Sequence, residues 1–570
     1  MAPLIVRRAP DAGRVHELLA HTGCEVLARV YAARAVQVRD LDAGLGALLP
    51  PRGLGQLEPA LDLLQRALRE RQRILVVGDY DADGATSTAL ALRGLRALGA
   101  GPVDYLVPSR FRDGYGLSPA LVAVAAERGA QLILTVDNGV SAFAGVAAAA
   151  EYGIPVLVTD HHLPGRQLPG AAAIVNPCLA GAAFESKCLA GVGVLFYLLL
   201  ALRARLREAG WFDAARPEPR LADWLDLVAL GTVADVVPLD RNNRLLVGQG
   251  LRRIRAGRAV PGIGALLAVA GREAGRVQAS DLGFAVGPRL NAAGRLDDMS
   301  LGIECLLADD ADAALTLAER LDALNRERRE LEGEMRAQAL DMVDRLELDG
   351  DLPAALCLHD TQWHQGMVGL VAARVRERVH RPVIAFAPAA DGSLKGSGRS
   401  IPGLHLRDAL ADVAALEPEL MAAFGGHAMA AGLTLERSRL ERFSAAFERA
   451  VAQRLGADAL QPRLHSDGPL AAGQADLALA RRLTGGGPWG QGFEEPLFDN
   501  AMELLESRVV GGNHLRCRLR WPGQGAVIEG IGFGLADAAP PRGPVHLAYR
   551  LAVNEWRGAA RAELRIEAFV

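Results

Sequence analysis

The sequence predicts an α/β protein with a parallel-sheet domain, a long bridging helix, a second α/β domain and a C-terminal β domain. Between residues 72 and 300, short apolar and β-branched runs alternate with helical segments, which is typical of βαβ units and a parallel sheet. Apolar residues keep helical spacing over 301–348, with charges between them, which indicates one long helix or two. After about residue 460, short alternating runs such as 514–521 and 545–554 favour a small barrel or sandwich.

The elements follow in order along the chain. The first 70 residues predict short helices, which break at Pro50-Pro51 and end in an amphipathic helix over 61–71. Strands of the first sheet are expected over 74–78, 103–107, 132–136 and 156–159. Helices between them are expected over 85–98, 119–128 and 142–152. The second α/β region predicts strands over 354–358 and 383–387 and helices over 367–379 and 404–416.

These patterns divide the chain into five parts. They are an N-terminal helical segment (1–70), a parallel-sheet domain (71–300), a bridging helix (301–350), a second α/β domain (351–455) and a β domain (460–570).

Composition bounds the class of protein. A chain of 570 residues is long enough for two to four domains, and its hydrophobic share of 50% fits globular domains. The net charge of −4 counts against a nucleic-acid binder, although local basic patches can exist on an acidic protein. No secretory signal is evident, the longest apolar run (191–202) is too short to span a bilayer, and the six cysteines form no CxxC pair. We therefore expect reduced thiols and a cytoplasmic location.

Three carboxylates, Asp79, Asp81 and Asp83, follow the first expected strand at alternate positions. Alternate residues of an extended segment face the same way, so these acids repel one another unless a cation lies between them. Asp137-Asn138-Gly139 and Asp160-His161-His162 follow two later strands. Because carboxyl ends of parallel strands meet at one edge of a sheet, we expect all three sets to converge there.

A fourth candidate, Asp235, follows the apolar segment 224–230. Each set also has a plainer interpretation: an acidic surface turn, an Asn-Gly turn, a surface histidine pair, or a helix cap at Asp235. Convergence of all four on one edge favours the metal site. Oxygen ligands with one or two imidazoles suit Mn²⁺ or Mg²⁺, and Zn²⁺ less well. The number of acids suggests two ions that clamp an in-line displacement at phosphorus, with Asp137 as the bridging carboxylate.

These motifs resemble the DHH phosphoesterase family, whose name-giving signature is Asp160-His161-His162. The resemblance is closest to the branch of bacterial single-strand-specific 5′→3′ DNA exonucleases. It rests on GDYDADG (78–84), NAAGR (291–295), WHQG (363–366) and FGGH (424–427), the last of which marks the DHH-associated domain. In many relatives, a histidine lies four residues before the first aspartate of their own version of this acidic motif. Val77 occupies that place here, which favours the exonuclease branch and leaves the first metal's ligand list less certain.

The resemblance implies roles for these residues. Asp81 and Asp137 resemble ligands of one metal, and Asp79 serves that metal or its water. Ligands of the second metal would be Asp83, Asp137, His161 and Asp235. His162 resembles a phosphate contact or a group behind the direct ligands.

The resemblance also implies contacts to DNA. The 5′-terminal phosphate and nearby DNA would be held by Arg110, Arg289, Ser397, Arg399, Gly425, Gly426 and His427, the second-domain residues lying on glycine-lined polar turns. His364 would lie in the DNA channel. The C-terminal region resembles an OB-fold, whose charge and stacking surface would come from Arg508, Arg516, Arg518, Arg520 and Trp521. Surface salt bridges and an ordinary basic barrel face are the alternatives.

The function expected from the resemblance is two-metal hydrolysis of phosphodiester bonds from a 5′ end of single-stranded DNA, in recombination and repair. One alternative is a DHH enzyme that acts on short oligonucleotides, cyclic dinucleotides or pyrophosphate, although such enzymes need no C-terminal β module. The other is a non-catalytic DNA-binding scaffold, which the complete ligand set disfavours. The resemblance further implies a monomer with single-strand-binding protein and a helicase as partners.

Overall fold

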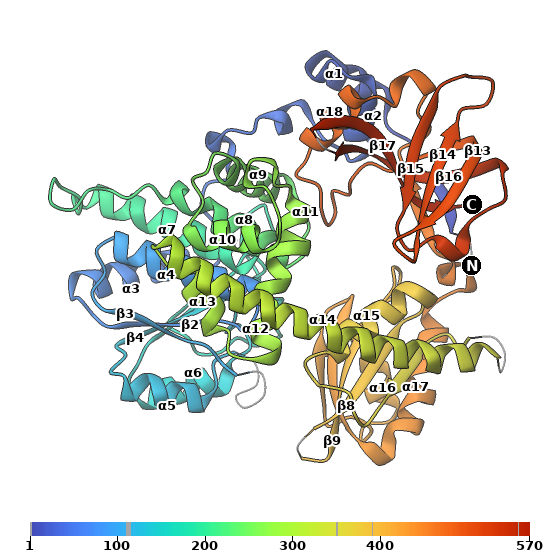
Figure 1. Cartoon of the computed structure of the whole chain (residues 1–570). Helices are drawn as coiled ribbons and strands as arrows, with labels where there is room; N and C mark the ends of the chain where they lie inside the picture. Colours follow the sequence, from blue (N-terminus) through green and yellow to red (C-terminus); the bar gives the residue numbers. More distant parts are fainter. Residues whose placement is uncertain (1–2, 110–115, 349–351, 390, 557) are drawn as a thin grey trace. The chain divides into compact units, whose positions relative to one another are not determined.

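The computed structural model describes residues 3–109, 116–348, 352–389, 391–556 and 558–570 (Figure 1). The chain forms two compact units. One unit comprises residues 10–325 and 482–495, and the other comprises residues 1–9, 326–481 and 496–570. Both units are therefore built from segments that are distant in sequence.

The first unit contains a five-stranded, fully parallel sheet in the order β3-β2-β4-β5-β6. The strands are β2 (Ile74–Val77), β3 (Val103–Leu106), β4 (Leu132–Val136), β5 (Val156–Thr159) and β6 (Ala173–Val175). The sequence predicted the first four of these strands, whereas the three-residue β6 is too short to leave a pattern. The strand order reverses between β2 and β4, and ligands of open α/β sheets bind at the carboxyl edge of such a switch point.

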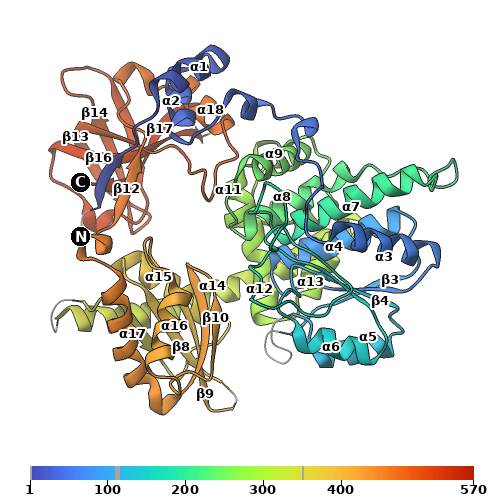
Figure 2. The same cartoon turned by 180° about the vertical axis from the view of Figure 1, so that it is seen from behind.

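Two hydrophobic cores cover this sheet (Figures 1 and 2). Ile74 and Val76 of β2 pack into the core that includes α3 (Leu57–Arg69), α4 (Ala82–Ala97) and α7 (Gly191–Glu208). Leu75 and Val77 face the opposite core, with α5 (Pro119–Glu127) and α6 (Phe143–Glu151). Because alternate side chains of a strand point to opposite faces, a strand buried on both sides reads as a continuous apolar run.

This unit contains further helices besides those that flank the sheet. They are α1 (Ala12–Thr22), α2 (Glu25–Ala33), α8 (Leu225–Ala234), α9 (Arg241–Arg255), α10 (Pro261–Val269), α11 (Ala279–Asp281), a π-helical turn (Leu282–Val286), α12 (Gly287–Leu296) and α13 (Ser300–Leu307). Short 3₁₀ turns of the whole chain cover Val38–Leu41, Leu45–Ala47, Leu221–Trp224, Ala274–Arg276, Arg437–Arg439, Ala457–Leu460, Ala472–Gln474 and Ala536–Ala538.

The expected bridging helix is separate from α13. It is α14 (Ala311–Leu348), a helix of 38 residues, and the boundary between the two units falls within it. Asp310 ends the break before α14, since its carboxylate accepts a hydrogen bond from the Ala313 N–H at 2.8 Å. The sequence left one helix or two open, and the structure has two.

The second α/β domain has a mixed sheet in the order β10-β11-β9-β8-β7. Its strands are β7 (Leu356–His359), β8 (Val383–Pro388), β9 (Ser393–Arg399), β10 (Ala423–Gly426) and β11 (Ala430–Glu436), and its helices are α15 (Val368–Val379), α16 (Leu406–Leu416) and α17 (Leu440–Arg454). The expectation that Ser397, Arg399, Gly425 and Gly426 form turns is wrong, because they lie in strands β9 and β10. Glycine has a low strand propensity, so this glycine-rich sequence concealed the strands.

The C-terminal β domain is a closed barrel in the order β13-β14-β15-β17-β16. The strands are β13 (Phe498–Val510), β14 (His514–Arg520), β15 (Val527–Gly532), β16 (Gly543–Trp556) and β17 (Ala559–Phe569), and α18 (Leu477–Gly485) precedes them. The predicted fold class is confirmed. One element of the N-terminal segment is not helical, because β1 (Leu4–Arg7) pairs in parallel with β12 (Arg463–Ser466). Among the described residues, no helix has both the length and the apolar character to cross a membrane.

Candidate metal centre

The carboxyl edge of the parallel sheet gathers the predicted metal ligands from the ends of β2, β4 and β5 and from the end of α8. Potential ligand atoms lie within 4.8 Å of one another in three groups. The groups are Asp79, Asp81 and Asp137; Asp83, His161 and Asp235; and Asp137, His161 and His162. The structure therefore brings together all seven residues that the sequence assigned to the catalytic site.

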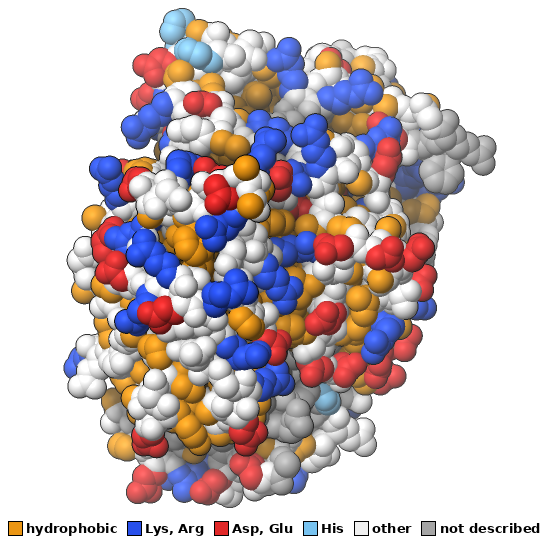
Figure 3. Space-filling model, turned by 90° about the vertical axis from the view of Figure 1, so that its left-hand side faces the viewer, with side chains coloured by type: hydrophobic (Ala, Val, Ile, Leu, Met, Phe, Trp, Pro, Cys, Tyr) orange, Lys and Arg blue, Asp and Glu red, His pale blue; other side chains and the backbone are white. Residues whose placement is uncertain are grey.

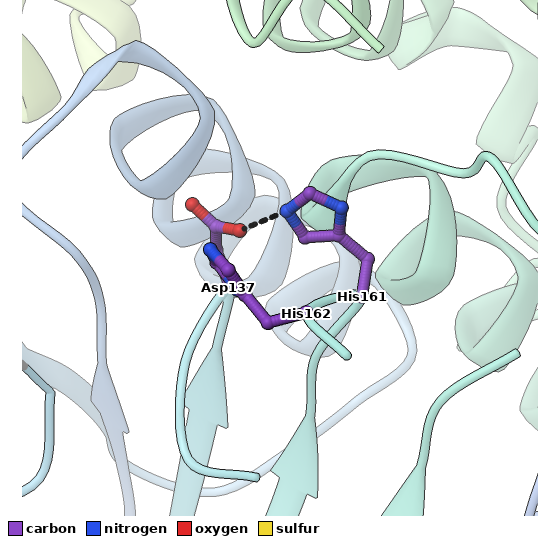
Figure 4. Close-up of side chains that lie close together, drawn as sticks. All are labelled: Asp137, His161 and His162. Atoms are coloured by element: carbon purple, nitrogen blue, oxygen red, sulfur yellow. Dashed lines mark ion pairs between the residues drawn. The ribbon is translucent and has the colours of Figure 1, made fainter. Parts of the chain in front are cut away.

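Asp137 lies at the centre of this cluster. His161 Nε2 is 3.1 Å from Asp137 Oδ1 and 3.5 Å from Asp235 Oδ2. Figure 4 shows the side chains of His161 and Asp137 pointing toward each other. The backbone of Asp137 is left-handed, with φ of 62°, which is uncommon for a residue other than glycine. Asn138 holds this turn, because its side-chain amide donates to the carbonyls of Val77 at 3.0 Å and Val136 at 2.9 Å. The strained turn thus places the Asp137 carboxylate between neighbouring strand ends.

Asp83 lies at the N-terminus of α7. Its carboxylate accepts hydrogen bonds from the backbone N–H of Gly191 at 2.6 Å and of Val192 at 3.0 Å. The positive end of a helix dipole favours a negative charge at this place. A Cβ atom at Gly191 would lie 2.6 Å from the Cβ and Oδ1 atoms of Asp137, so only glycine lets α7 approach the cluster.

The acidic turn after β2 is fixed by its own hydrogen bonds. Asp81 caps α4, accepting from the Gly84 N–H at 2.9 Å, and Asp79 accepts from the Tyr80 N–H at 2.7 Å. The helix α12 supports the same turn, since the Asn291 side-chain oxygen accepts from the Ala82 N–H at 2.7 Å. The NAAGR motif therefore positions the acidic turn, a role that the sequence did not reveal.

Asp160 organises the DHH segment from behind the cluster. It accepts hydrogen bonds from the N–H groups of Val140, His161 and His162 and lies 2.7 Å from Nδ1 of the His162 ring. Burial disfavours the charged forms of both Asp160 and His162, but the hydrogen bond between the two side chains outweighs the effect of burial. It holds the pKa of Asp160 below its ordinary value and raises the pKa of His162 to about 9. Sequence reasoning did not assign Asp160 a role, although it opens the signature triplet.

The electrostatics of the cluster suit a divalent cation. Burial, and then the charge of Asp81, raises the pKa of Asp83 to about 7. Burial, and then the charges of Asp83 and Asp81, raises the pKa values of Asp137 and Asp235 well above the ordinary range. These carboxylates repel one another in a space with little solvent, and a cation would remove that repulsion. Carboxylates with imidazole form a donor set that fits Mn²⁺ or Mg²⁺.

Two arginines of the first unit, Arg289 and Arg110, were predicted to contact DNA. Arg289 is buried, and its guanidinium binds the Asp322 carboxylate at 2.8 Å and the Ala285 carbonyl at 2.7 Å. This ion pair joins α12 to α14, so a phosphate would have to compete with Asp322. Arg110 lies outside the described residues.

In the second α/β domain, Arg399 donates to Ser397 Oγ at 3.2 Å and to the Gly398 carbonyl at 2.8 Å. A Cβ atom at Gly369, in the first turn of α15, would lie 2.9 Å from both side chains. The β10–β11 turn holds His427, whose N–H donates to the Ala430 carbonyl at 2.8 Å, and Gly425 and Gly426 precede it. Burial lowers the pKa of His364, which accepts from the Gly366 N–H at 3.2 Å.

The barrel carries its arginines on one side of β13 and β14, but acids accompany them. Arg516 is 2.6 Å from Glu529, and Arg518 is 3.5 Å from Glu506. Figure 3 shows another part of the surface, the left-hand side of Figure 1, where Lys and Arg side chains also lie among Asp and Glu side chains. Arg508 is exposed, and no described acidic side chain forms an ion pair with it. The barrel therefore presents a mixed and not a uniformly basic face.

The expectation that Trp521 offers a stacking surface is wrong. Its side chain is buried, and its indole N–H donates to the Leu470 carbonyl at 3.1 Å. Trp521 continues the alternation of Leu515, Cys517 and Leu519, whose side chains are buried, so the pattern that turns the arginines outward turns Trp521 inward.

A parallel sheet with a carboxylate and imidazole cluster at its carboxyl edge defines a metal-dependent hydrolase with a DHH-type domain. Sequence profiles agree: the DHH family, N-terminal domain, matches residues 73–232, the DHHA1 domain matches residues 352–453, and the RecJ OB domain matches residues 466–568. The chain belongs to the RecJ family.

Curated relatives named single-stranded-DNA-specific exonuclease RecJ match nearly the whole chain. Those of Escherichia coli and Salmonella typhimurium are each 54% identical over 95% of both chains. The Bacillus subtilis relative is 31% identical over 100% of this chain and 67% of its own length. Among solved structures, Thermus thermophilus RecJ in complex with Mn²⁺ has a TM-score of 0.84 and 33% identity, over 100% of this chain and 79% of that chain. The structure of the same Thermus protein with Mg²⁺ has a TM-score of 0.77.

Proposed function

We propose that this protein is a single-stranded-DNA-specific exonuclease that hydrolyses phosphodiester bonds from a 5′ end, in DNA recombination and repair. The observation that carries the proposal is the shared position of Asp137 between the groups around Asp81 and around His161. A carboxylate with one oxygen toward each group can bridge two cations, which is the arrangement of two-metal phosphodiester hydrolysis. The names of the RecJ relatives support the choice of single-stranded DNA as substrate.

The cofactors we propose are two Mn²⁺ or Mg²⁺ ions, in keeping with the ions bound in the Thermus structures. Asp79, Asp81 and Asp137 would hold one ion, and Asp83, Asp137, His161 and Asp235 would hold the other. When bound, such ions supply an acidified water and stabilise charge on the phosphate oxygens.

The remaining site residues position this donor set. The α7 N-terminus orients Asp83, and Asn138 fixes the Asp137 turn. Asp160 holds Nδ1 of the His162 ring and raises the pKa of that ring, which favours a ring that can donate to a phosphate oxygen. The proposed role of His162 is therefore contact with phosphate.

Polarity requires a group that holds the 5′ end. We assign this to Arg110, Arg289, Ser397, Arg399, Gly425, Gly426 and His427, with His364 in the channel and Arg508, Arg516 and Arg518 on the barrel. Arg399 supports this assignment, because its guanidinium lies beside Ser397 and the first turn of α15. A helix N-terminus next to an arginine is a favourable place for an anion.

The test is digestion of 5′-labelled single-stranded, blunt duplex and 5′-tailed DNA, each with Mn²⁺ and with Mg²⁺. We expect release of mononucleotides from the single strand and from the tail, and no digestion of the blunt duplex. Cleavage of dinucleotides without cleavage of long 5′-phosphorylated strands would instead favour the short-oligonucleotide enzyme. DNA binding without any cleavage would favour the scaffold. Single-strand-binding protein and a helicase as partners, a monomeric state and a cytoplasmic location stay predictions.

A further inference from the structure

An aromatic side chain beside the metal centre has no role in the function proposed above. Phe284 is 81% exposed, the largest exposed fraction of any large hydrophobic side chain among the described residues. It lies in the π-helical turn before α12, whose Gly287 N–H donates to the Leu282 carbonyl. Leu282 and Val286 of the same turn are fully buried, so the turn is anchored and presents only Phe284 outward. Single π-helical turns occur often at functional sites.

Close contacts fix where this turn lies. A Cβ atom at Gly283 would be 3.2 Å from Val233 Cγ1, and one at Gly287 would be 3.1 Å from Ala234 Cβ. Val233 and Ala234 directly precede Asp235, a proposed metal ligand. Glycines on both sides of Phe284 therefore hold its backbone against the end of α8.

The other end of α12 reaches the acidic turn. Asn291 accepts from the Ala82 N–H, and a Cβ atom at Gly294 would lie 1.8 Å from the Tyr80 carbonyl oxygen. The helix thus runs along the metal centre from Asp235 to the acidic turn after β2, with Phe284 at its outer end. Val236, which directly follows Asp235, is also largely exposed, at 63%. Two exposed apolar side chains are therefore near the end of α8: Val236 follows it in the chain, and Phe284 lies in the turn that packs against it.

We propose that Phe284 stacks on a base of the single strand whose phosphate lies at the metal centre. The inference rests on the proposed function. Stacking suits a nuclease that accepts any sequence, because every base has a π-face, and each stacked base contributes about 1–3 kcal/mol to binding. It also explains why an anchored turn presents an aromatic ring to solvent next to a charged cluster. Phe284 is in this view a substrate-contacting residue that orders the terminal nucleotides.

The test couples a protein change to the loss of single bases. Release of the 5′-terminal nucleotide is measured as kcat/KM on 5′-phosphorylated single strands that carry one abasic site at successive positions. We expect Phe284→Ala to lower kcat/KM about tenfold on the intact strand, and Phe284→Trp to retain it. For the wild type, we expect an abasic site at one particular position to lower kcat/KM by a similar factor. For Phe284→Ala, an abasic site at that position should lower kcat/KM no further than the substitution already does on the intact strand.

Tyr152→Ala is the matched control. Tyr152 is 56% exposed and ends α6, which places it at the opposite edge of the same sheet, so both substrates should be cleaved as by the wild type. The inference would be overturned if the losses in kcat/KM from Phe284→Ala and from the abasic site multiplied at every position. It would also be overturned if Phe284→Ala were as active as the wild type. A lower melting temperature with no dependence on abasic sites would mean that Phe284 packs against protein, which also overturns it. If the wild type releases no nucleotide from single strands, the proposed function itself fails and this inference falls with it.

Discussion

Asp137 joins two of the candidate ligand groups to each other and adopts a left-handed backbone that Asn138 holds. Replacement by asparagine keeps the shape of the side chain and removes its charge. We expect Asp137→Asn to reduce nuclease activity at least about 100-fold, since even groups behind metal ligands are worth 10- to 100-fold. Binding of single-stranded DNA should be largely retained.

The measurement is nuclease rate and DNA affinity of Asp137→Asn beside Asp309→Asn, an exposed aspartate that pairs with Arg93. Asp309→Asn should behave as the wild type. Unchanged activity of Asp137→Asn would rule out the bridging role.

Gly191 allows α7 to contact the metal cluster, and a methyl group there would overlap Asp137. We expect Gly191→Ala to displace α7 or Asp137, lowering the free energy of unfolding by about 1–3 kcal/mol and lowering the affinity for Mn²⁺. Metal titration by calorimetry and denaturant unfolding test both effects. Gly264→Ala in α10 is the control, because no atom lies within 4 Å of its Cβ position. Equal metal affinity of Gly191→Ala and the wild type would contradict this account.

The residue types and strand-end positions of the metal cluster could be predicted because carboxylates after buried strands must meet at one edge. Gly191 and Asp160 could not, since the first acts through a tertiary approach and the second through hydrogen bonds that no spacing encodes. The burial of Trp521 could have been predicted, because this residue continues the alternation of the buried Leu515, Cys517 and Leu519.

At the scale of elements, β1 and β12 meet β13 through a polar network. The buried Asp499 carboxylate accepts hydrogen bonds from Arg7, at 2.6 Å, and from Ser466, and lies 2.9 Å from His546 Nε2. Burial alone would raise the pKa of Asp499, but these bonds outweigh it and hold the pKa below its ordinary value. A depressed pKa means that the network stabilises the fold above the ordinary aspartate pKa and loses this effect as the pH falls through the lowered value.

Arg7→Gln tests this network. Because half of the Arg7 side chain is exposed, we expect a loss of about 1–2 kcal/mol in the free energy of unfolding at pH 7. The difference from the wild type should shrink as the pH falls below about 4. Denaturant unfolding from pH 7 to pH 3 provides the measurement. Arg463→Gln on the partner strand β12, where the arginine is exposed, should show neither effect. A difference that stays constant with pH would show that Asp499 is not its source.

Elements with a clear apolar run or face were predictable, and glycine-rich or very short ones were not. Helices α5 and α6 and strands β4 and β5 agree closely with expectation, and the two strands, which are buried on both faces, read as continuous apolar runs. Strands β9 and β10 contain Gly396, Gly398, Gly425 and Gly426, and a strand without side chains on one face has no hydrophobic pattern.

At the scale of the whole molecule, many charged side chains form ion pairs with side chains of opposite charge. The net charge of −4 therefore does not show which arginines are paired and which are exposed. Arg508 of β13 is exposed, whereas Arg516 forms an ion pair with Glu529. We expect Arg508→Gln to flatten the slope of log affinity for single-stranded DNA against log salt by about 0.7, the value of one phosphate contact.

The binding is measured in the Asp137→Asn protein to prevent digestion. Arg516→Gln should change the slope less, because its guanidinium would first have to leave Glu529. Arg550→Gln on β16, which pairs with Glu567, should leave the slope unchanged. A slope unaltered by Arg508→Gln would count against DNA binding by this face of the barrel.

The pairing of β1 with β12 also has a consequence for biosynthesis. Arg7 of β1 also binds Asp499 of β13, which is 492 residues further along the chain. At a translation rate of about 5–20 residues per second, Arg7 waits roughly 25–100 s before Asp499 leaves the ribosome. The parallel-sheet domain can fold in that interval, whereas the first strand must stay unpaired until β12 emerges, and Arg7 has no Asp499 to bind until the first barrel strand follows. Two consecutive arginines, Arg7 and Arg8, end that strand and help keep it from associating with other nascent chains while it waits.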